Sequence, residues 1–453
     1  MITFSVIQKS QLEGAMRLDA EFYCVSNDLL CKFVTGKDAI EFAQYGTSKE
    51  LNESSRGFRV LRLNEFEDFF ITEPSKYCDI INKITFNELK LKSGDVLICR
   101  TNGNPKLVGK AAIVMEDTEI AFASYLFRVR PKKELINSAT LVSFLNSRFG
   151  RAQIERFLMP SIQSNFSPAQ FRAIKIPIFP KNIQEEIEAL VKNSYILKNQ
   201  AKRFYFEAES LLLEELGMKN FEADENLSSI VNLSDVKSAH RMDAEYFQKK
   251  YKTILDKLSK KSQSNLSELF SIIRGKNFNY KDDGEIGVIK TKQLGKQKIN
   301  FEVESKTSSE ITEKEKLPIL KNGDVVFASM GVGSLGKTNI FYDLDAPEML
   351  FTIDSTIKIF RQKEKNNVLP EVLVVFFNSW VGQELIYKYI VGSSGIISIY
   401  ENSLNEFKIP ILQIETQQKI SNLVRQSHEA RKKAKELLEE AKRKAEEMIE
   451  RGG

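Results

Sequence analysis

The sequence predicts an α+β fold: two repeated mixed α/β domains, separated by two long antiparallel helices that pair as a coiled coil about a pseudo-two-fold axis. Two observations support this fold class. Several short motifs recur in the same order in both halves of the 453-residue chain. Each half also ends in a long stretch whose residues, at alternating steps of three and four, lie on one side of a helix.

The motifs and the helical stretches divide the chain into four segments. We expect a first domain at residues 1–180, a central helix at 181–217, a linker with the second domain at 218–412, and a C-terminal helix at 413–453. A chain of this length exceeds one ordinary hydrophobic core, so more than one domain is expected.

The repeat is defined by four motifs that precede each helix. In the first copy they are RLDAEFY at 17–23, LKSGDVL at 91–97, FLNS at 144–147 and KIPI at 175–178. In the second copy they are RMDAEYF at 241–247, LKNGDVV at 320–326, FFNS at 376–379 and KIPI at 408–411. The offset between the copies rises only from 224 to 233 residues, while the intervening segments have little in common. This order indicates a duplicated scaffold that presents two different faces.

Within each copy the motifs predict particular elements. Residues 91–100 and 320–329 are expected to form a glycine turn followed by a buried strand, because β-branched and apolar residues follow the glycine. Return strands are expected at 111–117 and 338–344, further strands at 125–131 and 355–362, and short helices at 141–149 and 371–377. The Ile-Pro pair before each long helix favours an extended backbone, and Gly217 is a predicted helix stop.

The long helices carry matching seams. The first seam contains Ile183, Ile187, Leu190, Ser194, Leu197, Ala201, Phe204, Ala208 and Leu211. The same positions 233 residues later are Thr416, Ile420, Leu423, Ser427, Ala430, Ala434, Leu437, Ala441 and Lys444. We predict that the two helices pack on each other, and that their small residues allow the helix axes to approach closely. The apolar side chains predicted to pair them are Ile183, Ile187, Leu190, Leu197, Phe204, Leu211, Ile420, Leu423, Ala430 and Leu437.

Composition narrows the class of protein. The chain is 42% hydrophobic and 28% charged, as in ordinary globular proteins, and its net charge of +5 permits nucleic-acid binding without requiring it. The four cysteines contain no C-x-x-C pair, which predicts reduced thiols rather than a zinc site or a disulfide framework. We find no signal peptide and no apolar run long enough to span a membrane, so a cytoplasmic protein is expected.

One motif suggests a nucleotide-binding enzyme. Residues 331–338 (GVGSLGKT) fit the phosphate-binding P-loop pattern G-x-x-x-x-G-K-[ST]. That loop requires a helix after it, whose N-terminus binds the phosphates. The residues that follow are β-branched and aromatic, so we favour a loop between two strands.

Other candidates for catalysis are weaker. The Asp-Ala-Glu sequences at 19–21 and 243–245 stand beside an arginine, which favours an anchoring ion pair or a helix start over acid–base catalysis. His240 and His428 are the only histidines and lie far apart in the sequence, so they support neither a metal site nor a Ser-His relay. The chain has no N-P-P-Tyr or D-P-P-Tyr adenine-methylation signature. We therefore expect no catalytic residues and no metal ligands.

Polar residues in loops at matching places of both copies are candidates for DNA binding. Arginine, lysine, asparagine and glutamine read base edges in the major groove, and further cations bind phosphates. The candidates in the first copy are Arg56, Arg59, Asn102, Asn104, Lys106, Lys110, Gln163 and Asn165. Those in the second copy are Lys276, Asn277, Asn279, Lys290, Lys292, Gln293, Ser334 and Lys337.

The duplicated order of R-x-D-A-E-[FY]-[FY], L-K-x-G-D-V and K-I-P-I, with Gln184 and Gln417 near the start of each helix, resembles the specificity subunits of type I restriction–modification systems. The resemblance covers essentially the whole chain. It implies that each copy is a target-recognition domain, and that the helices are antiparallel spacers between two DNA half-sites. It also implies docking of two methyltransferase subunits, with a translocating nuclease (restriction) subunit as a further partner. S-adenosylmethionine, ATP and Mg²⁺ are expected on those partners and not on this chain.

The resemblance predicts a bipartite, asymmetric target on double-stranded DNA at which partner subunits methylate adenine and cleave. A helix of about 35 residues is about 52 Å long at roughly 1.5 Å per residue. That length corresponds to about fifteen base pairs at roughly 3.4 Å each. Two alternatives remain open at this point: the recognition subunit of a fused methylase–nuclease system, and a coiled-coil scaffold or adaptor without a role on DNA.

Overall fold

The computed structural model describes residues 31–158, 164–222, 228–295, 297–346, 348–364, 366–392 and 397–452. The motif at 17–23, Cys24 and Gln163 lie outside these ranges. The chain forms two compact units, one of Met1–Asn199 with Ala430–Gly453 and one of Gln200–Glu429. Each unit contains one copy of the repeat and part of both long helices.

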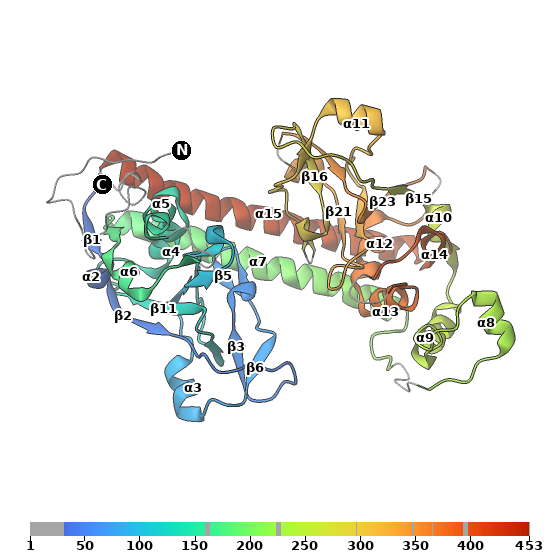
Figure 1. Ribbon diagram of the computed structural model, residues 1–453, viewed down its shortest axis with the longest axis horizontal. Coiled ribbons are helices and arrows are strands. Elements are labelled where there is room, and N and C mark those ends of the chain that lie inside the picture. Colours follow the sequence, from blue (N-terminus) through green and yellow to red (C-terminus); the bar gives the residue numbers. More distant parts are fainter. Residues whose placement is uncertain are drawn as a thin grey trace. The chain divides into compact units, whose positions relative to one another are not determined.

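The first unit is built on a mixed six-stranded sheet with the strand order β2-β11-β7-β9-β5-β4 (Figure 1). These strands are β2 (Ile40–Tyr45), β4 (Phe66–Glu67), β5 (Phe70–Ile71), β7 (Val96–Cys99), β9 (Ala111–Ile113) and β11 (Leu126–Pro131). A second sheet has the order β10-β3-β6 and contains β3 (Phe58–Leu61), β6 (Lys76–Cys78) and β10 (Ile120–Phe122). Two short antiparallel ladders join β1 (Phe33–Thr35) to β13 (Lys175–Pro177) and β8 (Thr101–Asn102) to β12 (Ser164–Asn165).

Short helices complete the first unit. They are α2 (Gly36–Ala39), α3 (Lys83–Leu89), α4 (Ser138–Asn146), α5 (Arg148–Phe157) and α6 (Pro168–Ala173), with 3-10 turns η2 (Leu63–Glu65) and η3 (Pro105–Leu107). One face of the large sheet packs with α4 around a phenylalanine cluster that includes Phe127, Phe144 and Phe171. The other side joins the three-stranded sheet and α3 in a separate core.

The second unit repeats this plan with a smaller central sheet, ordered β15-β23-β20-β21. Its strands are β15 (Phe270–Arg274), β20 (Val325–Ala328), β21 (Thr338–Ile340) and β23 (Ile357–Gln362). A three-stranded sheet contains β16 (Ile286–Ile289), β19 (Lys306–Thr307) and β22 (Leu350–Ile353). Two ladders pair β14 (Gln263–Asn265) with β24 (Lys408–Pro410) and β17 (Leu294–Gly295) with β18 (Lys298–Ile299).

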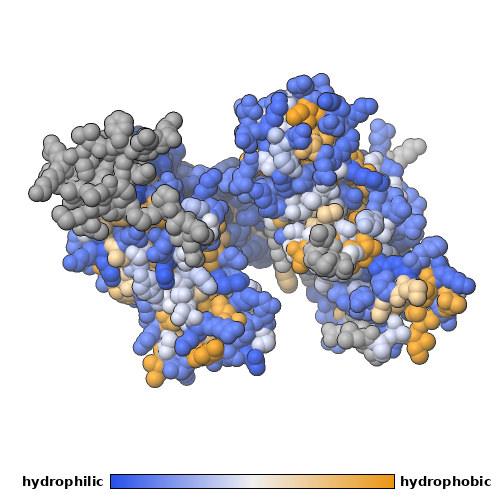
Figure 2. Space-filling model, viewed as in Figure 1, coloured by the Kyte–Doolittle hydropathy of each residue, from blue (hydrophilic) through white to orange (hydrophobic). Residues whose placement is uncertain are grey.

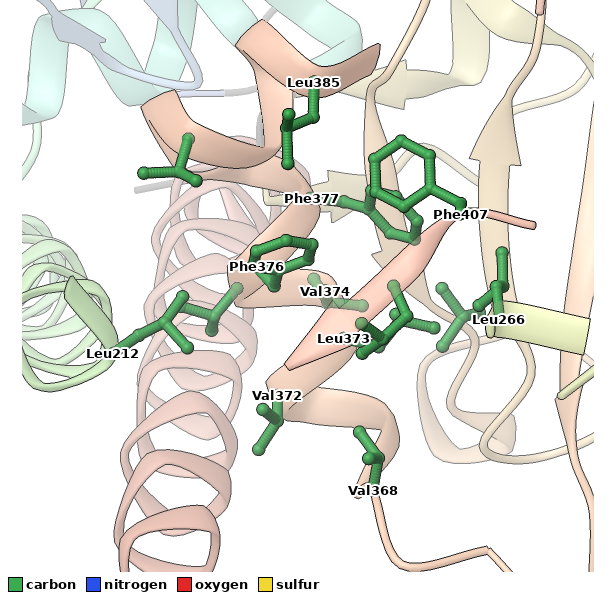
Figure 3. Packing of buried hydrophobic residues seen from close by; sticks show 14 of the residues in the cluster. Leu212, Leu266, Val368, Val372, Leu373, Val374, Phe376, Phe377, Leu385 and Phe407 are labelled. Carbon is green, nitrogen blue, oxygen red and sulfur yellow. The ribbon is translucent and has the colours of Figure 1, made fainter. Parts of the chain in front are cut away.

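The helices of the second unit are α8 (Leu233–Ala239), α9 (Lys249–Leu258), α10 (Leu266–Leu269), α11 (Ser309–Glu315), α12 (Pro370–Asn378), α13 (Trp380–Lys388) and α14 (Glu401–Asn405), with η4 (Thr291–Gln293) and η5 (Asp343–Asp345). Of these, α9, α10, α12, α13 and α14 contribute buried side chains to the largest core of the unit. Figure 3 shows Phe376 and Phe377 of α12 with Phe407 in this core, and the rings of Phe377 and Phe407 are 5.3 Å apart. Tilted aromatic pairs at this separation stabilise a core beyond the area that they bury.

The predicted strand pairs are confirmed in both copies. Gly94 and Gly323 adopt φ values of +87° and +85° at the turn before β7 and β20, a conformation that favours glycine. Both strands are fully buried, and β9 and β21 return antiparallel to them. The helices predicted at 141–149 and 371–377 correspond to α4 and α12, although α4 already ends at Asn146, and each is followed closely by a second helix, α5 or α13.

The aspartate of the L-K-x-G-D-V motif has the same role in both copies. Asp95 is completely buried and accepts bonds from Arg128 Nη1 at 3.0 Å and Arg130 Nη2 at 2.6 Å. Asp324 likewise accepts from Nε (2.8 Å) and Nη2 (2.6 Å) of Arg361. Each carboxylate thus ties the turn before one buried strand to the neighbouring strand, β11 or β23.

The side chain of the asparagine in the F-x-N-S motif forms two hydrogen bonds with the backbone of a strand residue, one accepted and one donated, as a residue of a neighbouring strand would. Asn146 accepts from Ala111 N at 3.1 Å and donates to Ala111 O at 2.9 Å. Asn378 makes the equivalent pair with Thr338, at 3.3 and 2.8 Å. The serine after each asparagine caps the next helix, α5 or α13.

The long helices are α7 (Lys181–Glu215) and α15 (Ile414–Arg451). In the first unit they run antiparallel, because Glu186 pairs with Lys444 while Ser194 Oγ donates to Ala434 O at 2.8 Å (Figure 1). In the second unit Ser427 Oγ donates to Ala201 O at 2.7 Å. A serine hydroxyl reaches a facing backbone carbonyl only where two helices approach closely. The prediction that these helices pack together through small residues is confirmed.

The buried seam differs from the predicted one by one residue at alternate positions. Buried on α7 are Gln184, Ile187, Val191, Ser194, Lys198, Ala201, Tyr205, Ala208, Leu212 and, just beyond it, Leu216. On α15 the buried residues Gln417, Ile420, Val424, Ser427, Ala434, Leu438, Ala441, Ala445 and Ile449 match all of them except Lys198 at the same 233-residue offset, and Ser421 and Ala430 are also buried. The predicted residues Ile183, Leu190, Leu197, Phe204, Leu211, Leu423 and Leu437 are half-buried beside this seam. Several of them pack against the domain cores.

Candidate DNA-recognition surfaces

A buried glutamine attaches each copy of the repeat to its long helix. Gln184 accepts from Asn137 N at 2.8 Å and donates to Leu135 O and Phe179 O. Gln417 makes the same three bonds, with Leu369 N, Asn367 O and Leu412 O. Because one side chain joins three backbone groups, each helix has a fixed orientation to the domain that precedes it. Polar loops of that domain are therefore held on a rigid support.

The motif RMDAEYF contributes a further anchor in the second unit. Arg241 binds both oxygens of Asp243, at 2.8 and 2.6 Å, and donates to Ile390 O. The Arg241 bond lowers the pKa of Asp243. Lys388 donates to Tyr246 O at 2.9 Å, and its burial lowers the pKa of the ammonium group to about 8. The predicted ion-pair role is confirmed for this copy, while the first copy of the motif lies outside the described residues.

In the first copy the candidate residues fall into two groups. Asn102 and Asn165 come together, because β8 and β12 pair with Asn102 opposite Ser164 and Thr101 opposite Asn165. Asn104 and Lys106 follow in the exposed η3 loop, where Asn104 Oδ1 accepts from Lys106 N. Lys110 is half-buried at the end of that loop.

Arg56 and Arg59 belong to the three-stranded sheet instead. Arg56 precedes β3 and lies 3.8 Å from Asp79, and Arg59 on β3 pairs with Glu73. These two arginines are partly neutralised by carboxylates. Gln163 lies outside the described residues, so the structure does not place it.

In the second copy the candidates lie in three places. Lys276 and Asn277 follow β15, where Asn277 Oδ1 accepts from Ser355 Oγ and Lys276 donates to Glu315 O. Asn279 is exposed in the same segment. Ser334 and Lys337 are half-buried in the glycine loop between β20 and β21. Since a strand follows that loop, it lacks the helix that a P-loop requires.

The third place is η4. Lys290 stacks on the exposed Tyr280 with its Nζ 3.8 Å from the ring centroid, and Lys292 pairs with Glu304 at 2.6 Å. Gln293 is only 4% exposed and accepts from Lys290 N. Gln293 therefore holds the turn and does not present its amide to a ligand.

Four residues that sequence reasoning missed contribute to a polar hollow of the first copy. Arg100, Thr101, Ser124 and Tyr125 line it together with the predicted Asn165, around a volume of about 310 Å³. Arg100 directly follows β7, and the matching residue after β20 is Ser329. A difference between copies immediately after a shared strand is the sequence signal that marks this position.

The face of each unit seen in Figure 2 is largely hydrophilic. An apolar patch lies elsewhere, over α8, where Ile230, Leu233 and Met242 are exposed.

Within the described residues, no helix is long and apolar enough to cross a membrane. No three His, Cys, Asp or Glu residues gather as a metal site in those ranges. The cysteines that are described, Cys31, Cys78 and Cys99, are free and buried.

Comparison with known proteins finds similarity over part of the chain. The family model described as "Type I restriction modification DNA specificity domain" matches residues 259–440. The EcoKI type I restriction enzyme specificity subunit of Escherichia coli (strain K12) is 31% identical over 106 residues, which are 22% of this chain and 23% of that subunit. The aligned part thus spans less than a quarter of the relative's length.

Solved structures give more distant matches over a longer range. The S subunit of a type I restriction–modification system from M. genitalium has a TM-score of 0.42 and 12% identity, covering 94% of this chain and 97% of that one. A chain of the structure described as "Structural basis underlying complex assembly and conformational transition of the type I R-M system" has a TM-score of 0.30 and 13% identity. That match covers 93% of this chain and 97% of the other.

Proposed function

We propose that this chain is the DNA-recognition subunit of a type I restriction–modification complex, because residues 259–440 match the model of the type I restriction modification DNA specificity domain and the sequence resembles the same family. Each copy of the repeat contacts one half of a bipartite site on double-stranded DNA. The chain supplies recognition, and partner methyltransferase subunits supply adenine methylation. A restriction subunit that translocates and cleaves DNA is a further partner.

One observation carries the proposal: residues shared by the two copies make the same bonds, whereas the polar loops differ. Asp95 and Asp324, Asn146 and Asn378, and Gln184 and Gln417 each hold equivalent parts of the scaffold. A duplicated support with two unlike polar faces suits a target with two unlike halves. An adaptor without a role on DNA gives no reason for this pattern.

The loops carry the groups that DNA recognition uses. Amide and guanidinium groups near Asn102 and Asn165 offer donors and acceptors to base edges. Lysines such as Lys106 and Lys337 offer cations to phosphates. The first copy and the second copy contribute different sets, so the target is not a palindrome.

Methylome sequencing tests the proposal directly. Cells that lack endogenous methylation would express this chain with its partner methyltransferase subunits. We expect adenine methylation at one motif of two different halves separated by unread bases. A continuous or palindromic motif would overturn the proposal, as would unchanged methylation when this gene is deleted.

A domain exchange tests the assignment of halves. Residues 1–180 would be replaced by the same segment of a related subunit, with the second copy as the internal control. We expect one half of the methylated motif to change while the other half is retained. A change in both halves would contradict the assignment of one half to each copy.

The salt dependence of binding separates this function from the scaffold alternative. Affinity of the complex for duplex DNA would be measured at increasing salt concentrations. We expect binding to fall steeply, because phosphate contacts release counterions. Binding to protein alone, with no affinity for DNA, would favour the scaffold.

A further inference from the structure

The hollow of the first copy lies where the chain leaves the central sheet. Arg100 follows β7, and its backbone N donates to Tyr125 O at 2.8 Å while its carbonyl accepts from Phe166 N at 2.7 Å. These bonds attach the residue to the start of β11 on one side and to the end of β12 on the other. The position of the side chain is therefore set by the sheet and not by a loose loop.

The guanidinium group of Arg100 is held in a defined orientation. Its Nε donates to Asn165 Oδ1 at 3.2 Å and its Nη1 donates to Ser124 O at 3.1 Å. Its Cζ lies 5.1 Å from the centre of the Tyr45 ring, a distance at which cation and ring attract each other. Two neutral acceptors and one aromatic face thus fix the plane of the group before any ligand arrives.

Arg100 also differs from other arginines of the first unit in its ion pairing. Arg59 pairs with Glu73, and Arg128 and Arg130 pair with Asp95. Among the residues that the structure describes, Arg100 has no carboxylate partner. Its Nη2 and the Nδ2 of Asn165 are not used by the bonds given above. The hollow therefore offers two neighbouring donors and an uncompensated positive charge.

Two donors side by side fit a base edge with two acceptors. In the major groove guanine presents O6 and N7 as adjacent acceptors, whereas adenine and cytosine each present a donor there. Tyr45 (48% exposed) and Tyr125 (55% exposed) add partly apolar surface beside the hollow. A phosphate also accepts from arginine, but it needs no neutral amide beside the cation.

We propose that Arg100 and Asn165 read a guanine in the half-site bound by the first copy. This assignment rests on the proposed function and adds the base and the residues that recognise it. The residues Thr101, Ser124 and Tyr125 position the pair, and the guanidinium group lies over the ring of Tyr45.

The second copy contains no equivalent of this pair among its described residues. Ser329 takes the place of Arg100, because its N donates to Thr356 O at 2.9 Å and its carbonyl accepts from Ile399 N at 3.1 Å. The nearest counterpart of Tyr45 is Arg274, at the end of β15, and Glu401 neutralises it and raises its pKa. Guanine recognition by an arginine–asparagine pair at this position is thus specific to one half of the target.

Methylome sequencing of variants in the complete complex tests the assignment. The variants are Arg100→Ala, Arg100→Lys and Asn165→Ala, and the matched control is Arg172→Ala, an exposed arginine on α6 of the same unit. A bidentate contact discriminates between bases by about 1–3 kcal/mol, or about 5- to 150-fold. We expect Arg100→Ala to relax one guanine position by that factor, Arg100→Lys to restore part of it, and the other half-site to stay unchanged. The retained half shows that the variant complex is folded.

A synthetic duplex supplies a second readout. Replacing that guanine by 7-deazaguanine removes N7, so binding by the wild-type complex should weaken while binding by the Arg100→Ala complex should not change further. Unaltered base preference in Arg100→Ala would overturn the inference. The inference would also be overturned if Arg100→Ala weakened binding equally on all DNA sequences and made binding less dependent on salt, because that pattern marks a phosphate contact. A wild-type motif that is bipartite but lacks guanine in the first copy's half would refute this inference alone, whereas the absence of any bipartite motif would refute the proposed function.

Discussion

The two copies of the repeat show which residues form the support and which vary. Asn146 and Asn378 make the same pair of backbone bonds in their own units, although most of the sequence around them differs. At the ends of the central strands the copies diverge, with Arg100 in one and Ser329 in the other. Repetition therefore marks the residues that hold the scaffold together, and divergence directly after a repeated strand marks the surface that we propose to read DNA.

The first way to test this comparison is to remove the buried aspartate from each copy. Asp95→Ala leaves Arg128, which is 5% exposed, without its carboxylate, and breaking a buried ion pair costs about 3–5 kcal/mol. Asp324→Ala affects only Arg361, which is partly exposed, so the loss of stability should be smaller. Calorimetry of each variant measures both effects.

Matched controls for these two variants lie at equivalent places of the two units. Glu134 follows β11 and Glu364 follows β23, and both carboxylates are exposed. Glu134→Ala and Glu364→Ala should therefore change stability by no more than about 0.5 kcal/mol. Equal losses for Asp95→Ala and Asp324→Ala would show that the second arginine of the first copy adds no stability.

The second prediction concerns pH, because the copies differ in one buried cation. Lys388 on α13 corresponds to Arg156 on α5, and both are buried. Burial lowers the pKa of Lys388 from 10.5 to about 8. Between these values the unfolded chain binds a proton that the folded one does not, so the free energy of unfolding of the second unit should rise from about pH 8 towards pH 10.

Denaturation followed from pH 7 to pH 10 measures this rise, which is on the order of 1–3 kcal/mol. Lys388→Met serves as the control, because it removes this titrating group and should reduce the slope to that of the remaining groups, among them Lys358, whose pKa burial also lowers. Arg156 makes no such contribution to the first unit, since arginine stays charged throughout the range. A slope that is equal in Lys388→Met and in the wild type would assign the effect to another group.

Much of this architecture could be predicted from the sequence, because its signals are local or repeated. The turn-strand pairs, the KIPI strands and the packing of two helices all follow from spacing and from glycine or proline. The predicted seam was wrong at alternate positions: Leu190 is only half-buried at the side of the cluster in which Val191 is fully buried with Leu438 and Ala441 of α15. A sequence pattern does not distinguish two apolar neighbours when a helix buries more than one face.

The candidate site was harder to predict, because contacts over long sequence separations decide it. Asn165 is close to Arg100 only because β8 and β12 pair. Gln293 has an amide group of the kind that can read a base edge, yet its side chain is buried as part of a 3-10 turn. Loop residues of the same type thus serve either the support or the surface, and the fold determines which.

The smallest predicted effect concerns the helix pair. Ser194 donates to Ala434 O and Ser427 donates to Ala201 O, and each bond is the other's counterpart at the 233-residue offset. A net hydrogen bond contributes about 1 kcal/mol, so Ser194→Ala and Ser427→Ala should each lower stability by that amount. Replacing either serine by leucine should cost more, because a larger side chain separates the helices. Two equal small losses, measured by denaturant unfolding, would show that the duplicated helices retain equivalent contacts; unequal losses would show that divergence has extended from the recognition surfaces into the scaffold.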